Sequence, residues 1–220
     1  NNSVKASALT ALAQMNYTGL PAIIESGLKH NSREVRTAAI TYLDRIKVSK
    51  EELPGITNSV FKDGSVNEQQ QLMKVLGQMP IDNTKVVLNE LLDKLGDGSL
   101  NKNIILDLTE TIEKGKDQQL IDKLNTFKAK GSATDQYAES LYGGTRNTGR
   151  EIFYFNQTAQ CVRCHSVNKD GNGTVGPDLH KIGSKLSREQ ILQSLIEPSA
   201  RIAPGYGNVT VVLTDNQEVT

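Results

Sequence analysis

The chain has 220 residues, of which 37% are apolar and 23% are charged, a composition typical of globular proteins. Its 25 basic and 25 acidic residues cancel, and no run of Lys and Arg supplies the basic stripe that nucleic-acid binding requires. No apolar stretch approaches the roughly 20 residues needed to cross a bilayer. We therefore expect neither nucleic-acid binding nor a membrane span.

Residues 3–127 carry apolar side chains at the three- and four-residue spacing of amphipathic helices. Helix pairs begin near residues 3, 32, 66 and 99, a period of about 30–34 residues. The segment NSREVRTAAITYLDRI (31–46) resembles a HEAT repeat, in which Asn or Asp precedes a Val-Arg-x-x-Ala-hydrophobic run. We predict four degenerate HEAT-like pairs forming an α-solenoid over residues 1–128, with an irregular helical bundle as the alternative. The apolar faces include Val4, Leu9, Leu20, Ile24, Val35, Ala39, Leu72, Leu76, Leu88, Leu92, Leu108, Ile112, Leu120 and Leu124.

Small polar residues indicate where several of these helices begin. Ser49 followed three residues later by Glu52 is a capping box, in which each side chain bonds the other residue's backbone N–H. Asp82, Ser99 and Asp117 are the N-caps expected for later helices.

Residues 129–148 are rich in Gly and small polar residues and predict a connector around a short helix at 134–141. The segment TGREIFYFNQTAQ predicts one helix ending at Cys161. Ser187 and Gln190 form a capping box for a later helix. Its buried stripe is predicted to be Ile191, Leu192, Leu195 and Ile196.

The last residues predict an interrupted β-ribbon. Residues 208–214 alternate like a strand, Asp215–Asn216 predicts a turn, and only four residues of the return strand follow. The chain also begins with Asn1 and has no signal-peptide pattern. We expect a piece of a longer protein, so the missing signal peptide indicates nothing about compartment.

The two cysteines of the chain, Cys161 and Cys164, are three residues apart, and His165 follows directly. Covalent haem attachment needs two thiols spaced to reach the two vinyl groups on one porphyrin edge. It also needs an adjacent imidazole to supply an axial nitrogen to the iron. Cys161, Cys164 and His165 meet both requirements, which predicts one covalent haem c per chain with His165 as the proximal iron ligand.

Three other interpretations compete with haem. Chance produces this arrangement roughly once in 8,000 chains of such composition. A structural zinc site needs four ligands, and only the distant His30 or His180 could complete one. A thioredoxin-like redox pair should follow a strand and open a helix, whereas this pair follows a predicted helix and enters a Gly-rich loop. Haem is the preferred interpretation.

Further motifs agree with a cytochrome. Gly176–Leu179 resembles the Gly-Pro-x-Leu segment of class I c-type cytochromes, in which the proline carbonyl accepts the proximal imidazole N–H. Pro177 is therefore a candidate residue of the haem site, with an ordinary turn proline as the alternative. Gly149 and Phe153 resemble the Gly-x-x-x-aromatic face at which the first cytochrome helix crosses a later one.

Together, GREIF, CVRCH, GPDLHKIG and SREQILQSLIEPSARIAPGY resemble the Pirellula/Verrucomicrobium-type haem-binding domain, over residues 149–220. The resemblance implies a small class I-like cytochrome c domain, truncated at its C-terminus, after the connector at 129–148. Such modules typically follow HEAT-like repeats, often behind a β-propeller sugar or alcohol dehydrogenase. The resemblance therefore implies a periplasmic or cell-surface electron carrier that is fused to, or serves, a dehydrogenase.

The expected distal ligand is missing from this pattern. Class I cytochromes usually offer a Met there, but Met15, Met73 and Met79 all lie in the repeat region, and Ala203 stands where Met is expected. An open or water-bound site, His180, a donor such as Tyr206 or a Lys, and a residue beyond 220 remain alternatives. Loss of a thioether ligand predicts a lower haem potential.

The leading function is electron transfer from a fused or partner dehydrogenase, and we expect the domain not to be an enzyme by itself. The alternative is a haem-based gas or redox sensor, or a docking module, with an open sixth coordination site. A haem enzyme such as a peroxidase needs a distal acid or base, and no distal His-Arg pair can be identified. The solenoid predicts a protein-docking surface.

Overall fold

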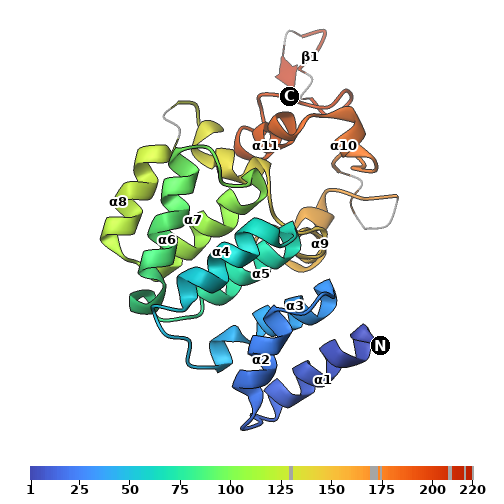
Figure 1. Ribbon diagram of the computed structural model, residues 1–220. Helices are drawn as coiled ribbons and strands as arrows, with labels where there is room; N and C mark the ends of the chain where they lie inside the picture. The colour runs from blue at the N-terminus through green and yellow to red at the C-terminus, as the bar shows by residue number, and fades with distance from the viewer. Residues whose placement is uncertain (129–130, 169–172, 174, 208–209, 216, 220) are drawn as a thin grey trace. The chain divides into compact units, whose positions relative to one another are not determined.

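The computed structural model describes residues 1–128, 131–168, 173, 175–207, 210–215 and 217–219. Most of them are helical, which confirms the prediction of a mainly α fold (Figure 1). The chain divides into two compact units, Asn1–Lys128 and Ala129–Thr220. In the described part of the chain, no helix is both long enough and apolar enough to span a membrane, in agreement with the prediction.

The first unit consists of eight α-helices joined by short connections. They are α1 (Asn2–Gln14), α2 (Leu20–Leu28), α3 (Arg33–Thr41), α4 (Leu53–Asp63), α5 (Val66–Leu76), α6 (Ile81–Gly96), α7 (Ile105–Gly115) and α8 (Gln118–Phe127). There are also two short 3-10 helices: η1 (Leu43–Arg45) follows α3, and η2 (Lys102–Ile104) precedes α7. Most helices pack against the next helix but one along the chain. This gives one series of packed helices, α1–α3–α5–α7, and a second series, α4–α6–α8.

One continuous apolar core runs through this unit. Its buried members include most of the predicted apolar faces: Leu9, Leu20, Ile24, Ala39, Ile40, Leu43, Leu72, Leu76, Leu88, Leu91, Leu92, Ile104, Leu108, Ile112, Leu120 and Leu124. Val4 was expected in this set but is 63% exposed, and the buried residues of α1 are Leu9 and Ala13.

The predicted helix starts were partly correct. Ser49 and Glu52 make the predicted reciprocal bonds, Ser49 N to Glu52 Oε2 at 3.1 Å and Glu52 N to Ser49 Oγ at 3.2 Å, but α4 begins only at Leu53, with Glu52 in the cap position. Asp117 caps α8, since its Oδ1 accepts the N–H of Leu120 at 3.1 Å. The cap at Asp82 was wrong because Pro80 precedes α6, which already includes Asp82.

The cap predicted at Ser99 was also wrong. Asn101 precedes η2 instead and accepts the N–H of Asn103 at 3.0 Å. A capping box at Ser65 and Glu68, which starts α5, was not identified from the sequence. Glu68 has a second role, because its buried carboxylate also accepts a bond from Arg36 Nε on α3 at 2.7 Å.

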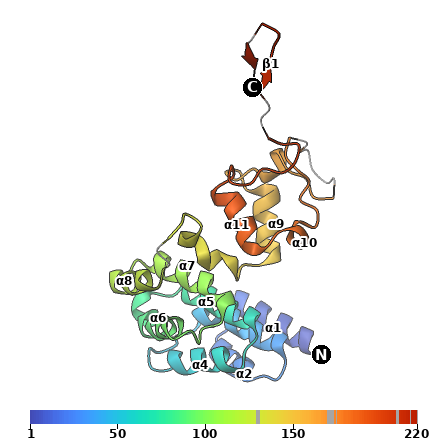
Figure 2. The same cartoon turned by 90° about the horizontal axis from the view of Figure 1, so that it is seen from above.

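The second unit contains short elements. They are η3 (Asp135–Leu141), α9 (Arg146–Phe155), η4 (Cys161–Arg163), α10 (Ile182–Lys185), α11 (Arg188–Ile196), β1 (Val211–Val212) and β2 (Glu218–Val219). The strands pair antiparallel, with Val211 opposite Val219 (Figure 2 draws both as arrows). Part of the predicted turn, Asn216, lies outside the described residues. Ala129 and Lys130 of the predicted connector also lie outside them.

Two expectations for this unit were wrong. The helix expected to reach Cys161 ends at Phe155, because the side chain of Asn156 accepts the N–H groups of Thr158 and Ala159 and turns the chain. The close helix crossing expected at Gly149 is not seen, because no atom of the described residues outside its own helix backbone and chain neighbours lies within 4 Å of the position its Cβ would take.

The stripe predicted on α11 is not a buried core. Leu195 is 72% exposed, and no residue of α9 or α11 is buried. In the described part of residues 131–219, no large apolar side chain reaches the burial that is common in the first unit. The second unit therefore lacks, in that part, an apolar core of its own.

Candidate haem-binding site

The Cys-x-x-Cys-His segment begins in the turn that follows α9. Gln160 adopts the left-handed conformation (φ 46°), and η4 starts at the next residue, Cys161. The N–H of His165 donates to the carbonyl of Cys161 at 2.9 Å. This local bond closes the segment into one turn.

A second segment, 176–179, runs beside the first and is bonded to it through the backbone. Gly176 N donates to Cys164 O at 2.7 Å, and Leu179 N donates to Ser166 O at 2.8 Å. The side chain of Ser166, which is buried, also donates to Asp178 Oδ2 at 2.6 Å. The two segments are therefore fixed against each other on both sides of His165.

This arrangement brings His165 and Pro177 together. His165 Nδ1 lies 2.9 Å from the carbonyl oxygen of Pro177, twelve residues along the chain. Because a carbonyl oxygen can only accept a hydrogen bond, Nδ1 must carry the proton. In a neutral imidazole with this hydrogen bond, Nε2 is the nitrogen that has a lone pair for a metal ion.

Gly176 permits this close approach. A Cβ at this position would lie 2.8 Å from Cε1 and 2.9 Å from Nδ1 of His165, closer than real Cβ atoms approach other heavy atoms. Gly173 has a similar role, because a Cβ there would collide with the backbone of Cys164. The sequence did not indicate that either position requires a glycine. The requirement is seen only from the atoms that an added Cβ would meet.

The two predicted attachment residues are free thiols. Cys161 is half-buried and Cys164 is exposed. Arg163, between them, donates to Gln160 Oε1 at 2.7 Å and so braces the turn. Of the two predicted attachment residues, Cys164 is therefore the more open to solvent.

A second feature of this unit bears on the predicted haem. Apolar side chains lie open to solvent, among them Phe155 at 73%, Leu195 at 72%, Val175 at 75% and Ile202 at 53% exposure. A unit of this size without a buried core needs another source of stability. A porphyrin is a large apolar plate that could cover such side chains, so thiols, imidazole and uncovered apolar surface all suit the same group.

The zinc interpretation named His30 and His180 as the residues that could complete a site with the two thiols. Within the described residues, no group of three or more His, Cys, Asp and Glu side chains is placed to hold a metal ion. His30 accepts the N–H of Ser32 at Nδ1, 2.9 Å away. His180 is exposed and follows the segment that holds the imidazole, with its N–H donating to Asp178 Oδ1 at 2.6 Å.

The residues considered for the distal side stay predictions. Ala203 is half-buried and its carbonyl accepts the N–H of Tyr206 at 3.1 Å. The side chain of Tyr206 is 44% exposed.

No family model, curated protein or solved structure matches this chain.

Proposed function

We propose that Cys161, Cys164 and His165 hold a covalent haem c and that the chain transfers electrons. The observation that carries the proposal is the 2.9 Å contact between His165 Nδ1 and Pro177 O. It is the contact expected of a proximal haem histidine, and it leaves Nε2 as the metal-binding nitrogen. When bound, the haem supplies the one-electron Fe(III)/Fe(II) couple.

The residues of the chain have separate roles in this proposal. Cys161 and Cys164 attach the porphyrin through thioethers, and His165 ligates the iron through Nε2. Pro177 O holds the ring orientation and makes the imidazole more basic. Ser166 and Asp178 keep the segment that carries Pro177 in place.

For the fold, we propose a HEAT-like solenoid followed by a small class I-like cytochrome c domain. The packing of α1–α3–α5–α7 and of α4–α6–α8 supports the solenoid, since stacked repeats contact their neighbours in this way. We also propose a periplasmic or cell-surface location and a fused or partner dehydrogenase as electron donor. The haem module resemblance is the basis of both.

The test is maturation of the chain in a periplasm that attaches haem c. We expect a haem-stained band that survives denaturing electrophoresis and a pyridine haemochrome spectrum with two thioether bonds. Cys161→Ala should shift that spectrum to one thioether bond, and Cys161→Ala/Cys164→Ala should abolish covalent haem. His30→Ala is the matched histidine control and should leave attachment unchanged. A zinc ion bound in place of haem would contradict the proposal.

The ferric spectrum separates the two functional alternatives. A low-spin electron paramagnetic resonance signal indicates two strong axial ligands and an electron carrier. A high-spin signal, with rapid binding of CO after reduction, indicates an open sixth position and favours the sensor. We expect the low-spin signal. We also expect the haem to be reduced by a dehydrogenase that is fused to this chain or is its partner.

A further inference from the structure

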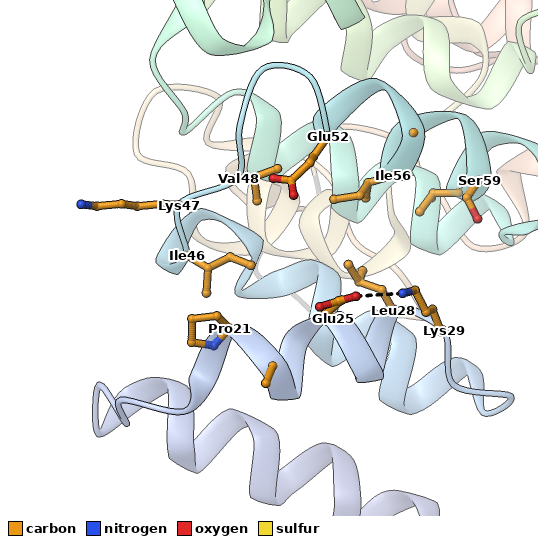
Figure 3. Close-up of a pocket in the computed structure, with 13 residues that line it drawn as sticks. Pro21, Glu25, Leu28, Lys29, Ile46, Lys47, Val48, Glu52, Ile56 and Ser59 are labelled. Carbon is orange, nitrogen blue, oxygen red and sulfur yellow. Dashed lines mark hydrogen bonds and ion pairs between the residues drawn. The ribbon is translucent and has the colours of Figure 1, made fainter.

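A groove of about 520 Å³ lies between α2 and α4 in the first unit (Figure 3). It extends over about two turns of each helix, from Pro21 to Leu28 on α2 and from Glu52, the residue before α4, to Val60 on α4. The side chains of Leu28, Ile46, Val48, Ile56 and Val60 make most of its lining apolar. None of these residues belongs to the proposed haem site.

The groove interrupts a pattern that the other repeats follow. Where α4 meets α6, Lys94 Nζ donates to Asn58 Oδ1 at 3.2 Å. Where α6 meets α8, Lys123 Nζ pairs with Asp93 Oδ1 at 2.6 Å. In each case a lysine of the later helix contacts a polar side chain of the earlier helix. We call the boundary between two such helices a seam, and the lysine contact bridges it.

The seam between α2 and α4 has no such bridge, although residues 1–128 are all described. Lys29 pairs with Glu25 on its own helix at 2.9 Å. Glu52 accepts the N–H and the hydroxyl of Ser49 with one oxygen, Oε2. Both carboxylates line the groove, and neither is paired with a cation from the opposite wall (Figure 3).

Glu52 is the carboxylate that can still accept a hydrogen bond from a ligand, through its second oxygen. Hydrogen bonds from the backbone and side chain of Ser49 lower the pKa of Glu52 and so favour its charged form. Its Oε1 has no partner within residues 1–128, and its side chain lies over the groove, whereas Lys47 extends away from it (Figure 3). A ligand of this groove therefore meets apolar side chains beneath one unpaired negative charge.

We propose that the groove binds an amphipathic helix of a partner protein, which presents apolar residues and one Lys or Arg to Glu52. Apolar side chains at positions i, i+4 and i+7 of a helix recur over two turns, which is the length of the groove. The basic side chain of the partner would bridge the seam between α2 and α4. It would take the place that Lys94 has between α4 and α6 and Lys123 has between α6 and α8. The proposal does not depend on the haem.

The experiment uses the full chain and a fluorescein-labelled amphipathic helical peptide of about 14 residues. The peptide carries Leu at i, i+4 and i+7 and Lys at i+3, and a second peptide carries Glu in place of the Lys. By fluorescence anisotropy we expect the Lys peptide to bind at least tenfold more tightly than the Glu peptide, with affinity that falls as salt rises. Glu52→Gln should remove that preference.

Gly55→Leu tests the location. Gly55 lines the groove, and among the described residues a Cβ there would meet no atom within 4 Å beyond its chain neighbours and its own helix backbone, so the leucine side chain starts from open space. We expect at least tenfold weaker binding, while Lys62→Leu, an exposed position of the same helix outside the groove lining, should leave affinity unchanged. Unchanged binding in Gly55→Leu, or equal affinity for both peptides, would overturn the proposal. Self-association of the chain that Gly55→Leu abolishes would show that a second copy, not a partner helix, occupies the groove.

Discussion

The position of one imidazole depends on the absence of a side chain eleven residues away, in a segment beside it. His165 Nδ1 reaches Pro177 O at 2.9 Å because Gly176 leaves room next to the ring. A single methyl group at Gly176 would occupy the space held by Cε1 and Nδ1 of His165. The neighbouring backbone bond from Gly176 N to Cys164 O prevents the segment from moving away freely.

Gly176→Ala is therefore expected to break the His165–Pro177 hydrogen bond. In the haem-loaded protein this should lower the yield of attached haem and change the ferric paramagnetic resonance g-values, because ring orientation and imidazole basicity both change. The two measurements are haemochrome absorbance per protein and the resonance spectrum.

Gly183→Ala is the matched control, since among the described residues its Cβ would meet no atom within 4 Å beyond its chain neighbours and its own helix backbone. It should leave both measurements unchanged. Equal effects of the two substitutions would show that Gly176 acts only through general stability and does not position the imidazole.

At the scale of elements, Glu68 connects α3 to the start of α5. Its side chain is 1% exposed, bonds Ser65 at the helix start and pairs with Arg36 on the neighbouring helix. Burial acts to raise the pKa of Glu68, but the bonds from Arg36 and Ser65 outweigh it and lower the pKa below the usual 4.5. The stabilisation is therefore complete above pH 4.5 and is lost as the pH falls through the lowered value.

We expect Glu68→Gln to destabilise the first unit by about 2 kcal/mol at pH 7, because the amide leaves the charge of Arg36 without its partner. The difference from the unsubstituted chain should shrink at pH 3, where the natural carboxylate becomes protonated as well. Urea denaturation followed by far-ultraviolet circular dichroism at the two pH values measures both effects.

Glu25→Gln offers the comparison on α2. Its partner Lys29 and Glu25 itself have 75% and 71% exposed side chains, so that this substitution should change stability by less than about 0.5 kcal/mol. Similar losses at Glu25 and Glu68 would contradict the role of burial in the Glu68 contact.

Across the whole molecule, the sequence predicted elements whose signals are local. The helices of residues 1–128 repeat an apolar spacing that neighbouring helices bury, and most of the predicted faces are buried. Asp82 and Ser99 were misassigned as caps because Pro80 and Asn101 compete with them nearby. The helix end at Phe155 depends on the side-chain bonds of Asn156, a turn signal that was missed in the sequence.

Contacts between distant residues were predictable only where a motif encodes them. Gly-Pro-x-Leu pointed to the approach of Pro177 to His165, whereas nothing in the sequence indicated the groove between α2 and α4. The groove depends on how closely two helices pack, which helical periodicity does not encode. Burial on α11 was mispredicted for a related reason, because periodicity identifies an apolar face but not what covers it.

The two units differ in what covers their apolar side chains. In the first unit one core buries them, while in the described part of the second unit residues such as Phe155 and Leu195 stay more than two-thirds exposed. A protein unit of under a hundred residues that lacks a core is marginally stable at best. If the proposed haem covers these side chains, attachment of the haem and folding of the second unit are coupled.

We therefore expect hydrogen exchange to distinguish the units. In haem-free Cys161→Ala/Cys164→Ala, amides of α9 and α11 should exchange at least about a hundredfold faster than in the haem-loaded chain, because their local opening is no longer opposed by buried apolar contacts. Amides of α5 and α6, which lie in the buried core of the first unit, should exchange equally in both proteins. Exchange followed by mass spectrometry measures both units in one sample, so α5 and α6 serve as the internal control. Equal protection of α9 and α11 with and without haem would mean that these helices are stabilised without the cofactor.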